Sequence, residues 1–503
     1  MSAALAPLAR APEQGCIPTT LPARTITVAA GDGIGPEITA AVLRVLAAAD
    51  PTLSFHEVTV GLKAYQQGEA AGLGSEALEA VTGHGVFLKG PITTPQGGGY
   101  KSVNVTLRKL LGLYANVRPS VAYAPFVQAL HPGMDVVVLR ENEEDTYAGI
   151  EHRQTDEVYQ CLKLITRPGC ERICRYAFEY ARAHGRRKVT CMTKSNIMKL
   201  TDGLFQQVFE ETARDYPEIV AEHMIIDIGT ARMAARPEAF DVVVTPNLYG
   251  DILSDVAAEV SGSIGLAGSA NIGRDCAMFE AVHGSAPDIA GRDLANPSGL
   301  LLAAVMMLNH LGRDAPATLI HNAWLRTLED GIHTGDIFRP GVSKRRVGTQ
   351  AFAAAVVERL GLGPNRLPAA QPARRVPMPC LEEAPAPAPQ ASKALVGVDV
   401  FLHWDEAGRD PAVLGRRLQW SQAGGLRLEL ITNRGVKVYP GGRSQTLRAD
   451  HWRCRFSAGG SVVSARDVPA LLSQLAAAGL DVVKTENLYA FDGQPGYSQA
   501  QGA

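Results

Sequence analysis

The sequence has little that would tie it to a nucleic acid, a membrane or an oxidising compartment. Its 49 basic and 51 acidic residues leave a formal net charge of −2, so no overall basic field attracts nucleic acid or an anionic membrane. The eight cysteines are scattered without a CxxC pair, which argues against a zinc site and fits reduced thiols in the cytoplasm. The most apolar run, residues 300–308, is far shorter than the roughly 20 residues of a membrane-spanning helix. The expected partners are small molecules and other copies of the chain.

The sequence also lacks an internal repeat, a coiled-coil heptad run and a Rossmann dinucleotide fingerprint. The nearest approach to that fingerprint is residues 31–37, Gly-Asp-Gly-Ile-Gly-Pro-Glu, which follow a predicted strand and open a predicted helix. Their glycines are spaced G-x-G-x-G with proline next, whereas the fingerprint requires G-x-G-x-x-G. A nicotinamide cofactor would therefore have to bind elsewhere.

What is present, through most of the chain, is an alternation of β-branched runs with helical patterns. Strands are predicted at residues 25–29, 136–140, 188–193 and 241–245, and helices at 37–49, 201–214 and 252–260. The alternation predicts an α/β fold.

A proline-rich segment marks a domain boundary. Eight prolines fall between Pro364 and Pro389, in a stretch that favours extended polyproline conformations. We expect a linker at residues 363–394 and a small α+β domain at 395–503. Residues 1–23, rich in alanine and proline, lack the charged and apolar regions of a signal peptide and are expected to form a flexible tail.

A cluster of basic and neutral polar residues falls between positions 101 and 140. It comprises Lys101, Ser102, Asn104, Arg108, Arg118 and Arg140. Each arginine offers a planar fork to one carboxylate, so the set suits a small substrate with several carboxylates. Any one of these residues alone could be a solvated surface group. Arg140 fits that alternative least, because it ends a buried strand, and such a position usually faces a cleft.

An acidic pair lies on a predicted amphipathic helix. Asp251 and Asp255 are four residues apart and share one face, where two carboxylates repel each other unless a cation lies between them. Oxygen ligands suit Mg²⁺ or Mn²⁺, although a solvated helix face is the alternative. Asp227 and Lys194 each follow an apolar run and could add a third ligand and a proton relay.

The loop at residues 283–296 bears on the cofactor. Its small residues allow a ligand to approach the backbone, and Asp288 can accept hydrogen bonds from a ribose diol while repelling a phosphate ester. The loop could also be an ordinary surface turn. As a cofactor loop it predicts NAD in preference to NADP.

Together these clusters fit one chemistry. Arginines for a polycarboxylate, a divalent metal, Lys194 and Tyr147 as proton carriers and a loop for NAD suit oxidation of a 2-hydroxy acid with loss of the neighbouring carboxylate. The metal would lower the hydroxyl pKa and stabilise the enolate left when CO₂ departs.

The chain resembles the β-decarboxylating dehydrogenase family, which contains isocitrate, 3-isopropylmalate and homoisocitrate dehydrogenases. The resemblance covers roughly residues 24–360 and rests on segments 31–37, 89–95, 102–109, 114–119, 140–142, 145–151, 194–199, 247–255 and 279–287. Segments 396–401, 433–435 and 491–493 resemble the extra C-terminal domain of long, Thermus-type bacterial isocitrate dehydrogenases.

The resemblance implies a two-domain isocitrate/isopropylmalate dehydrogenase-like α/β fold that is not a Rossmann fold, with the small α+β domain added. The large domain would comprise residues 24–113 and 262–362, and the small domain residues 114–261 with a dimer clasp near 145–166. It also implies at least a homodimer whose subunits share each active site.

Residue roles follow from the same resemblance. Substrate contacts would come from Ser102, Asn104, Arg108, Arg118 and Arg140, and cofactor contacts from Thr94, Asn196, Glu280, His283, Gly284, Asp288, Ile289 and Asn296. Tyr147 would protonate the enol carbon, and Lys194 of a second subunit would relay the hydroxyl proton. Asp251 and Asp255, with Asp227 of that second subunit, would hold the metal.

Ser102 and Asn104 stand where isopropylmalate enzymes have apolar side chains, so the resemblance favours isocitrate and a place in the tricarboxylic acid cycle. NADP-using relatives have Lys-Tyr where this chain has Asp288 and Ile289, which again predicts NAD. NAD-dependent homoisocitrate and isopropylmalate dehydrogenases remain alternatives, and a non-catalytic paralogue is a third, disfavoured because no catalytic group is missing. The C-terminal domain is expected to act in assembly, or alternatively to bind a regulatory ligand.

Overall fold

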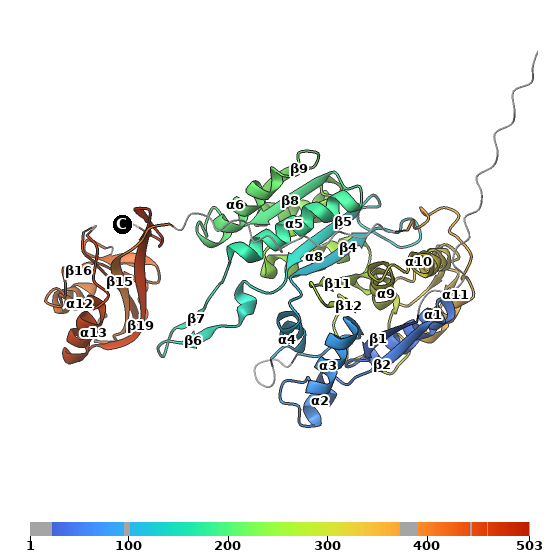
Figure 1. Ribbon diagram of the computed structural model, residues 1–503, viewed down its shortest axis with the longest axis horizontal. Coiled ribbons are helices and arrows are strands. Elements are labelled where there is room, and N and C mark those ends of the chain that lie inside the picture. The colour runs from blue at the N-terminus through green and yellow to red at the C-terminus, as the bar shows by residue number, and fades with distance from the viewer. Residues whose placement is uncertain (1–22, 95–100, 373–390, 443–444, 460, 502–503) are drawn as a thin grey trace, which may run out of the picture.

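The computed structural model describes residues 23–94, 101–372, 391–442, 445–459 and 461–501 (Figure 1). The predicted N-terminal tail lies outside the described residues as far as residue 22, as do residues 373–390 of the predicted linker.

A ten-stranded sheet forms the centre of the main body, in the order β2-β1-β3-β12-β11-β4-β5-β10-β8-β9. Its strands are β1 (Arg24–Ala29), β2 (Leu53–Glu57), β3 (Val86–Lys89), β4 (Ala115–Val121), β5 (Asp135–Glu141), β8 (Lys188–Thr193), β9 (Val220–Ile225), β10 (Val242–Thr245), β11 (Gly268–Ile272) and β12 (Ala277–Ala281). Both outer parts of the sheet are parallel, whereas β11 and β4 pair antiparallel with each other and with β12 and β5. The sheet therefore changes from one parallel half to the other at β11 and β4.

Helices cover both faces of this sheet. They are α1 (Gly35–Ala49), α2 (Leu62–Gln66), α3 (Ser75–His84), α4 (Val103–Leu110), α5 (Arg167–Ala183), α6 (Thr201–Ala213), α7 (Ile226–Ala235), α8 (Asn247–Ser261), α9 (Ser298–His310), α10 (Asp314–Glu329) and α11 (Thr349–Val357). Central strands such as β10 are buried along their whole length because helices pack on both sides, which explains their continuous valine runs. The mixed sheet and its helices confirm the predicted α/β class.

Short elements complete the body. They are the 3₁₀ turns η1 (Thr146–Ala148), η2 (Pro237–Ala239) and η3 (Ile264–Leu266), the pair β13 (Ile332–His333) and β14 (Arg345–Arg346), and the hairpin β6 (Glu151–Arg153) and β7 (Tyr159–Cys161). We call residues 151–161 the arm. Figure 1 shows it projecting from the body toward the C-terminal domain.

The C-terminal domain is an antiparallel sheet with two helices, which confirms the predicted α+β domain. Its elements are β15 (Lys393–His403), β16 (Arg427–Asn433), β17 (Val436–Tyr439), β18 (His451–Ser457), β19 (Asp481–Phe491), β20 (Gln494–Pro495), α12 (Pro411–Leu418) and α13 (Asp467–Ala477). The domain has its own apolar core, which includes Trp452 and Phe456.

The C-terminal domain contacts the tip of the arm through polar groups. Arg409 donates to both carboxylate oxygens of Glu157 at 2.8 Å, and the Thr155 hydroxyl donates to buried Asp450 at 2.6 Å. The arm therefore connects the C-terminal domain to the body at a second place besides the linker.

Within the described residues, no helix combines the length and apolarity needed to cross a membrane. The six described cysteines are free thiols, and Cys161 on the arm is the exposed one among them.

Candidate active site

A charged cavity of about 340 Å³ lies beside β4, β5 and β12, where α4 and α8 approach the sheet. All five residues predicted to bind substrate line it: Ser102, Asn104, Arg108, Arg118 and Arg140. Tyr147, Asp251, Glu280, His283, Gly284 and Thr94 line it as well. Helix α4 presents the first three because it begins at Ser102, whose hydroxyl caps the helix by accepting from the Val105 backbone N–H.

Glu280 organises the floor of the cavity. The buried carboxylate accepts from Lys89 Nζ, from Arg108 Nη2 at 3.1 Å and from Asn271 Nδ2 at 3.0 Å. Burial alone would raise the pKa of Glu280, but the charges of Lys89 and Arg108 lower it far below its usual range. Glu280 therefore stays ionised and holds the Arg108 guanidinium in place, and the cofactor contact predicted for it stays a prediction.

Arg118 on β4 connects the cavity to the acidic pair. Its Nη1 lies 3.2 Å from an Asp251 oxygen and 3.5 Å from an Asp255 oxygen, and Asn116 and Ser254 accept its remaining hydrogen bonds at 2.6 and 2.7 Å. Helix α8 begins at Asn247, earlier than predicted, so both aspartates lie within it and one turn apart. Burial raises the pKa of Asp255, and the charge of Asp251 adds to that rise.

Arg140 brings a third guanidinium to the same cavity. It lies one residue before the end of β5 and donates to Asn247 Oδ1 at 2.9 Å and to Asp251, and it stacks over the Tyr147 ring at 4.8 Å. Burial lowers the pKa of Arg140 to about 9, and the nearby charges of Arg108 and Arg118 act in the same direction. The cavity thus concentrates positive charge that an anionic ligand would neutralise.

Several polar atoms of the cavity have no hydrogen-bond partner among the residues described. They are Asn104 Oδ1, Arg108 Nε and Arg140 Nη2, all buried. Buried polar groups are seldom left without partners in folded proteins, so these atoms indicate the positions of a ligand's polar groups.

Tyr147, on the turn η1, donates from its hydroxyl to Asp251 Oδ2. Burial raises the pKa of Tyr147, and the hydrogen bond to the Asp251 carboxylate raises it too. The phenol therefore keeps its proton at neutral pH and can act as a general acid beside the arginines.

Lys194 and Asp227 lie outside this cavity. Lys194 follows β8 and contacts Asp227, in the first turn of α7, at 3.0 Å, and the Asp227 side chain is 68% exposed. Throughout the described part of the chain, no three His, Cys, Asp or Glu side chains gather to hold a metal. The predicted metal set of Asp227, Asp251 and Asp255 is therefore not assembled within one chain. Asn196, near Lys194, is exposed.

Only some of the predicted cofactor residues in the loop after β12 line the cavity. His283 and Gly284 line the cavity, Asp288 is exposed, and Ile289 packs partly against the core. Asn296 is buried and donates to Asp336 at 3.0 Å.

The sequence did not single out Lys89 and Asn271, which hold Glu280. Lys89 ends a fully buried strand, which is the same signal that identified Arg140. Asn271 lies in a buried strand and offered no comparable sign.

Similar proteins were found along nearly the whole chain. Isocitrate dehydrogenase [NADP] of Rickettsia bellii is 52% identical over 482 residues, which are 95% of this chain and 99% of that protein. Isocitrate dehydrogenase [NADP] of Thermus thermophilus is 46% identical and the match covers 95% of this chain and 96% of that protein. A crystal structure of a Thermus thermophilus protein superposes with a TM-score of 0.89 at 45% identity, over 95% of this chain and 96% of that chain.

These relatives overturn the prediction of NAD, since both are named for NADP. An aspartate repels a phosphate strongly only in a partly desolvated site. In the structure Asp288 is exposed, where water and salt screen its charge. Arg346 lies close to Gly335, because its Nη2 atom is 2.8 Å from the position that a Cβ atom would occupy on that glycine. The next residue, Asp336, accepts a hydrogen bond from Asn296 of the loop. One basic group, Arg346, therefore lies near the residue that Asn296 contacts.

Two family models match the chain. The isocitrate/isopropylmalate dehydrogenase family matches residues 25–356, and the bacterial isocitrate dehydrogenase C-terminal domain matches residues 393–503. The chain belongs to the isocitrate/isopropylmalate dehydrogenase family and carries the C-terminal domain of the bacterial isocitrate dehydrogenases.

Proposed function

We propose that this protein is an NADP-dependent isocitrate dehydrogenase, which oxidises isocitrate and releases CO₂ to give 2-oxoglutarate with the help of a divalent metal. One observation carries the proposal: three guanidiniums, the amide of Asn104 and the phenol of Tyr147 converge on one cavity of about 340 Å³. The names of relatives 46–52% identical to the chain support both the substrate and NADP.

The arginines bind the substrate by charge and orientation. Arg108 and Arg140 are fixed by Glu280 and Asn247, so their forks are pre-ordered for carboxylates. The unpaired Asn104 Oδ1 and the hydroxyl of Ser102 meet the end of isocitrate that distinguishes it from isopropylmalate. The amide would need its N–H₂ group turned toward a carboxylate, which a rotation about its last side-chain bond provides.

The chain's own residues move the two protons of the reaction. A bound nicotinamide would supply the acceptor for the hydride of the hydroxyl carbon, and a bound divalent cation would supply a Lewis acid for the hydroxyl oxygen. Lys194 of a second copy accepts the hydroxyl proton. After CO₂ leaves, Tyr147 gives its proton to the carbon from which CO₂ departed. The raised pKa of Tyr147 permits this step because the phenol is still protonated at neutral pH.

A second copy would complete the metal site. Asp251 and Asp255 supply oxygen ligands of the kind that Mg²⁺ and Mn²⁺ prefer, and Asp227 of that copy would be the third. The exposed side chains around Lys194 and Asp227 support this arrangement: Ile197 is 68% exposed, Ile228 48% and Ile252 55%. A patch of such residues on neighbouring elements is typical of a subunit interface.

The 2′-phosphate of NADP would meet Arg345 and Arg346 on β14. Both are exposed, and Arg346 lies against Gly335 beside the loop that carries Asn296. Removing Arg346 should weaken NADPH binding more than NADH binding, measured as the two dissociation constants by fluorescence titration.

We further infer that the C-terminal domain acts in the assembly of subunits, because it forms hydrogen bonds and an ion pair with the tip of the arm. Arg409 and Asp450 bind Glu157 and Thr155 there. Replacing Arg409 with alanine should shift dimers toward monomers in sedimentation experiments. Unchanged mass with altered kinetics would instead favour a regulatory role.

Comparison of substrates tests the proposal. The wild-type protein should turn over isocitrate with a higher kcat/KM than homoisocitrate or isopropylmalate. Asn104→Leu should lower kcat/KM for isocitrate by about 10- to 100-fold, the worth of a hydrogen bond to a charged group. Lys63→Leu, at an exposed position of α2 outside the cavity lining, is the control. Faster turnover of isopropylmalate by the wild type would refute the assignment.

A further inference from the structure

A second cavity, of about 740 Å³, lies on the opposite face of β4 and β11 from the charged one. Alternation along β4 separates the two, because Arg118 faces the charged cavity whereas Val117 and Pro119 line this one. Likewise Phe279 of β12 lines the second cavity and its neighbour Glu280 the first. Strands of the central sheet thus serve two cavities with different surfaces.

The second cavity is lined by apolar side chains and by neutral polar ones. Among its described lining residues there is no Asp, Glu, Lys or Arg. It therefore offers no counter-charge to a tricarboxylate or to a dinucleotide, both of which it would exclude. Its volume lies in the range of sites for small organic molecules.

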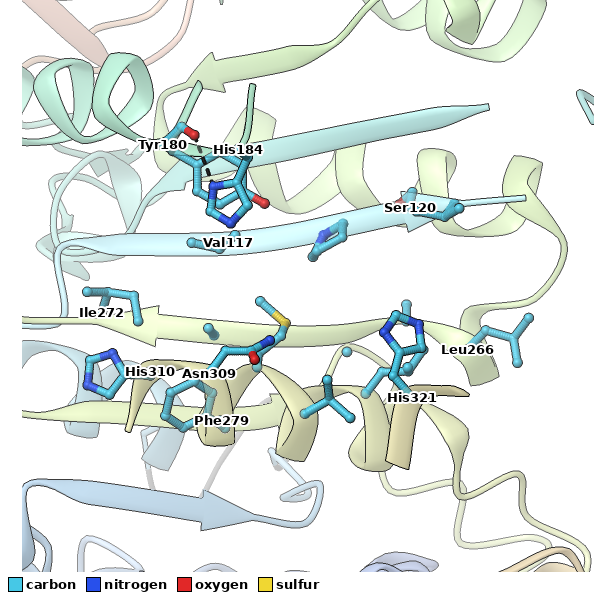
Figure 2. A pocket seen from close by; sticks show the side chains of 18 of the residues that line it. Val117, Ser120, Tyr180, His184, Leu266, Ile272, Phe279, Asn309, His310 and His321 are labelled. Carbon is cyan, nitrogen blue, oxygen red and sulfur yellow. Dashed lines mark hydrogen bonds between the residues drawn. The ribbon is translucent and has the colours of Figure 1, made fainter. Parts of the chain in front are cut away.

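Both halves of the body contribute walls. Figure 2 shows Tyr180 and His184, from the end of α5, facing His310 and His321, from α9 and α10, across β4 and β11. His184 and His310 are exposed and mark the mouth, whereas Phe279 is fully buried at the floor.

One polar atom in this cavity lacks a partner. His321 Nε2 is buried and has no hydrogen bond within the described residues, and Figure 2 places its ring on the cavity side of α10. Burial lowers the pKa of His321 to about 4, so the imidazole is neutral at pH 7 and has one donor and one acceptor nitrogen, of which Nε2 has no partner within the described residues. Such an orphaned group in an apolar cavity is most simply satisfied by a bound molecule.

We propose that this cavity is a binding site for an uncharged, mostly apolar small molecule whose one polar group hydrogen-bonds to His321. The assignment rests on the cavity alone and does not depend on the reaction. The molecule would lie against β4 and β11, where the two parallel halves of the sheet meet. Because its walls come from both halves, an occupant restrains any rotation of one half against the other, and that rotation also changes the charged cavity on the other face. Binding at the two cavities should therefore be coupled, and the coupling must be reciprocal.

N-phenyl-1-naphthylamine is a suitable probe, because it is uncharged, apolar and has one N–H group for His321. Titrated into the full-length protein, it should show saturable fluorescence enhancement at one site per chain. Val305→Trp fills the cavity from α9 and should weaken binding at least tenfold, and His321→Leu should weaken it about 2- to 10-fold for one lost hydrogen bond. Val462→Trp, at a 74% exposed position of the C-terminal domain, is the matched control and should leave binding unchanged.

Melting temperature and far-ultraviolet circular dichroism verify that each variant is folded. Should Val305→Trp fail to fold, His321→Leu alone decides between the outcomes. Non-saturable binding, or equal binding by both cavity variants and the wild type, would overturn the proposal. So would a dimer that binds no probe, since the second copy would then cover the cavity. A shift in the probe's dissociation constant on adding isocitrate, matched by the same factor in the reverse titration, would support the coupling.

Discussion

The two cavities of this protein use the same strands in opposite ways. On one face of the sheet, β4 and β5 present Arg118 and Arg140. Buried polar atoms of this cavity, such as Arg140 Nη2, have no hydrogen-bond partner within the described residues. On the other face, β4 presents Val117 and Pro119, and among the described lining residues His321 has the buried polar atom without a partner. Charge, not size, separates the two proposed sites, because the smaller cavity is lined by the arginines and the larger one has no Asp, Glu, Lys or Arg among its described lining residues.

The largest expected effect concerns the charged cavity. Arg140→Ala should lower kcat/KM for isocitrate by about 10²- to 10⁴-fold, since removing one partner of a buried charged pair costs about 3–5 kcal/mol. Steady-state kinetics check this, with Arg214→Ala at the exposed end of α6 as the control. A loss below tenfold in a folded variant would show that Arg140 does not bind the substrate.

Next in size is the loss of the proton donor. Tyr147→Phe should lower kcat by about 100-fold while KM changes little, because the phenol acts on the bound intermediate and not on substrate affinity. Tyr159→Phe on the exposed arm is the matched control. A change confined to KM would assign Tyr147 to binding.

A further test asks whether the charged cavity needs a second copy while the apolar one does not. Tyr147→Phe and Asp227→Asn homodimers should both be nearly inactive. After subunit exchange, half the dimers are mixed and each has one intact site, so about a quarter of wild-type activity should return. Probe binding to the apolar cavity should be the same in all three preparations. No recovery despite verified exchange would place each site within one chain.

The smallest effect concerns His321 and pH. Burial lowers the pKa of His321 in the folded protein to about 4, below that of an unfolded histidine. Between about pH 4 and 6.5 the unfolded chain therefore binds a proton that the folded chain does not, so stability falls as pH falls through this window. His321→Leu should remove about 2 kcal/mol of this loss between pH 7 and pH 5. Thermal midpoints at the two pH values check it, with His152→Leu on the exposed arm as the control. Parallel curves for wild type and His321→Leu would contradict it.

The charged face could be predicted from sequence and the apolar face could not. Arg140 ends an apolar run and Asp251 and Asp255 share a helix face, so their positions marked them as candidates for a charged site, and the family resemblance implied their roles. Val117 and Phe279 look like any core residues, and only their surroundings in the fold show that they line a cavity. The prediction of NAD from Asp288 was wrong because the sequence does not show that this side chain is exposed. An exposed carboxylate repels a phosphate only weakly. The domain boundaries and the shared site remain predictions.

The most direct test of the central claim is the stoichiometry of isocitrate turnover with Mg²⁺ and either cofactor. The proposal predicts one NADPH and one CO₂ per 2-oxoglutarate formed, with kcat/KM for NADP above that for NAD. NADPH formation without CO₂ release, or a higher kcat/KM with NAD, would contradict it.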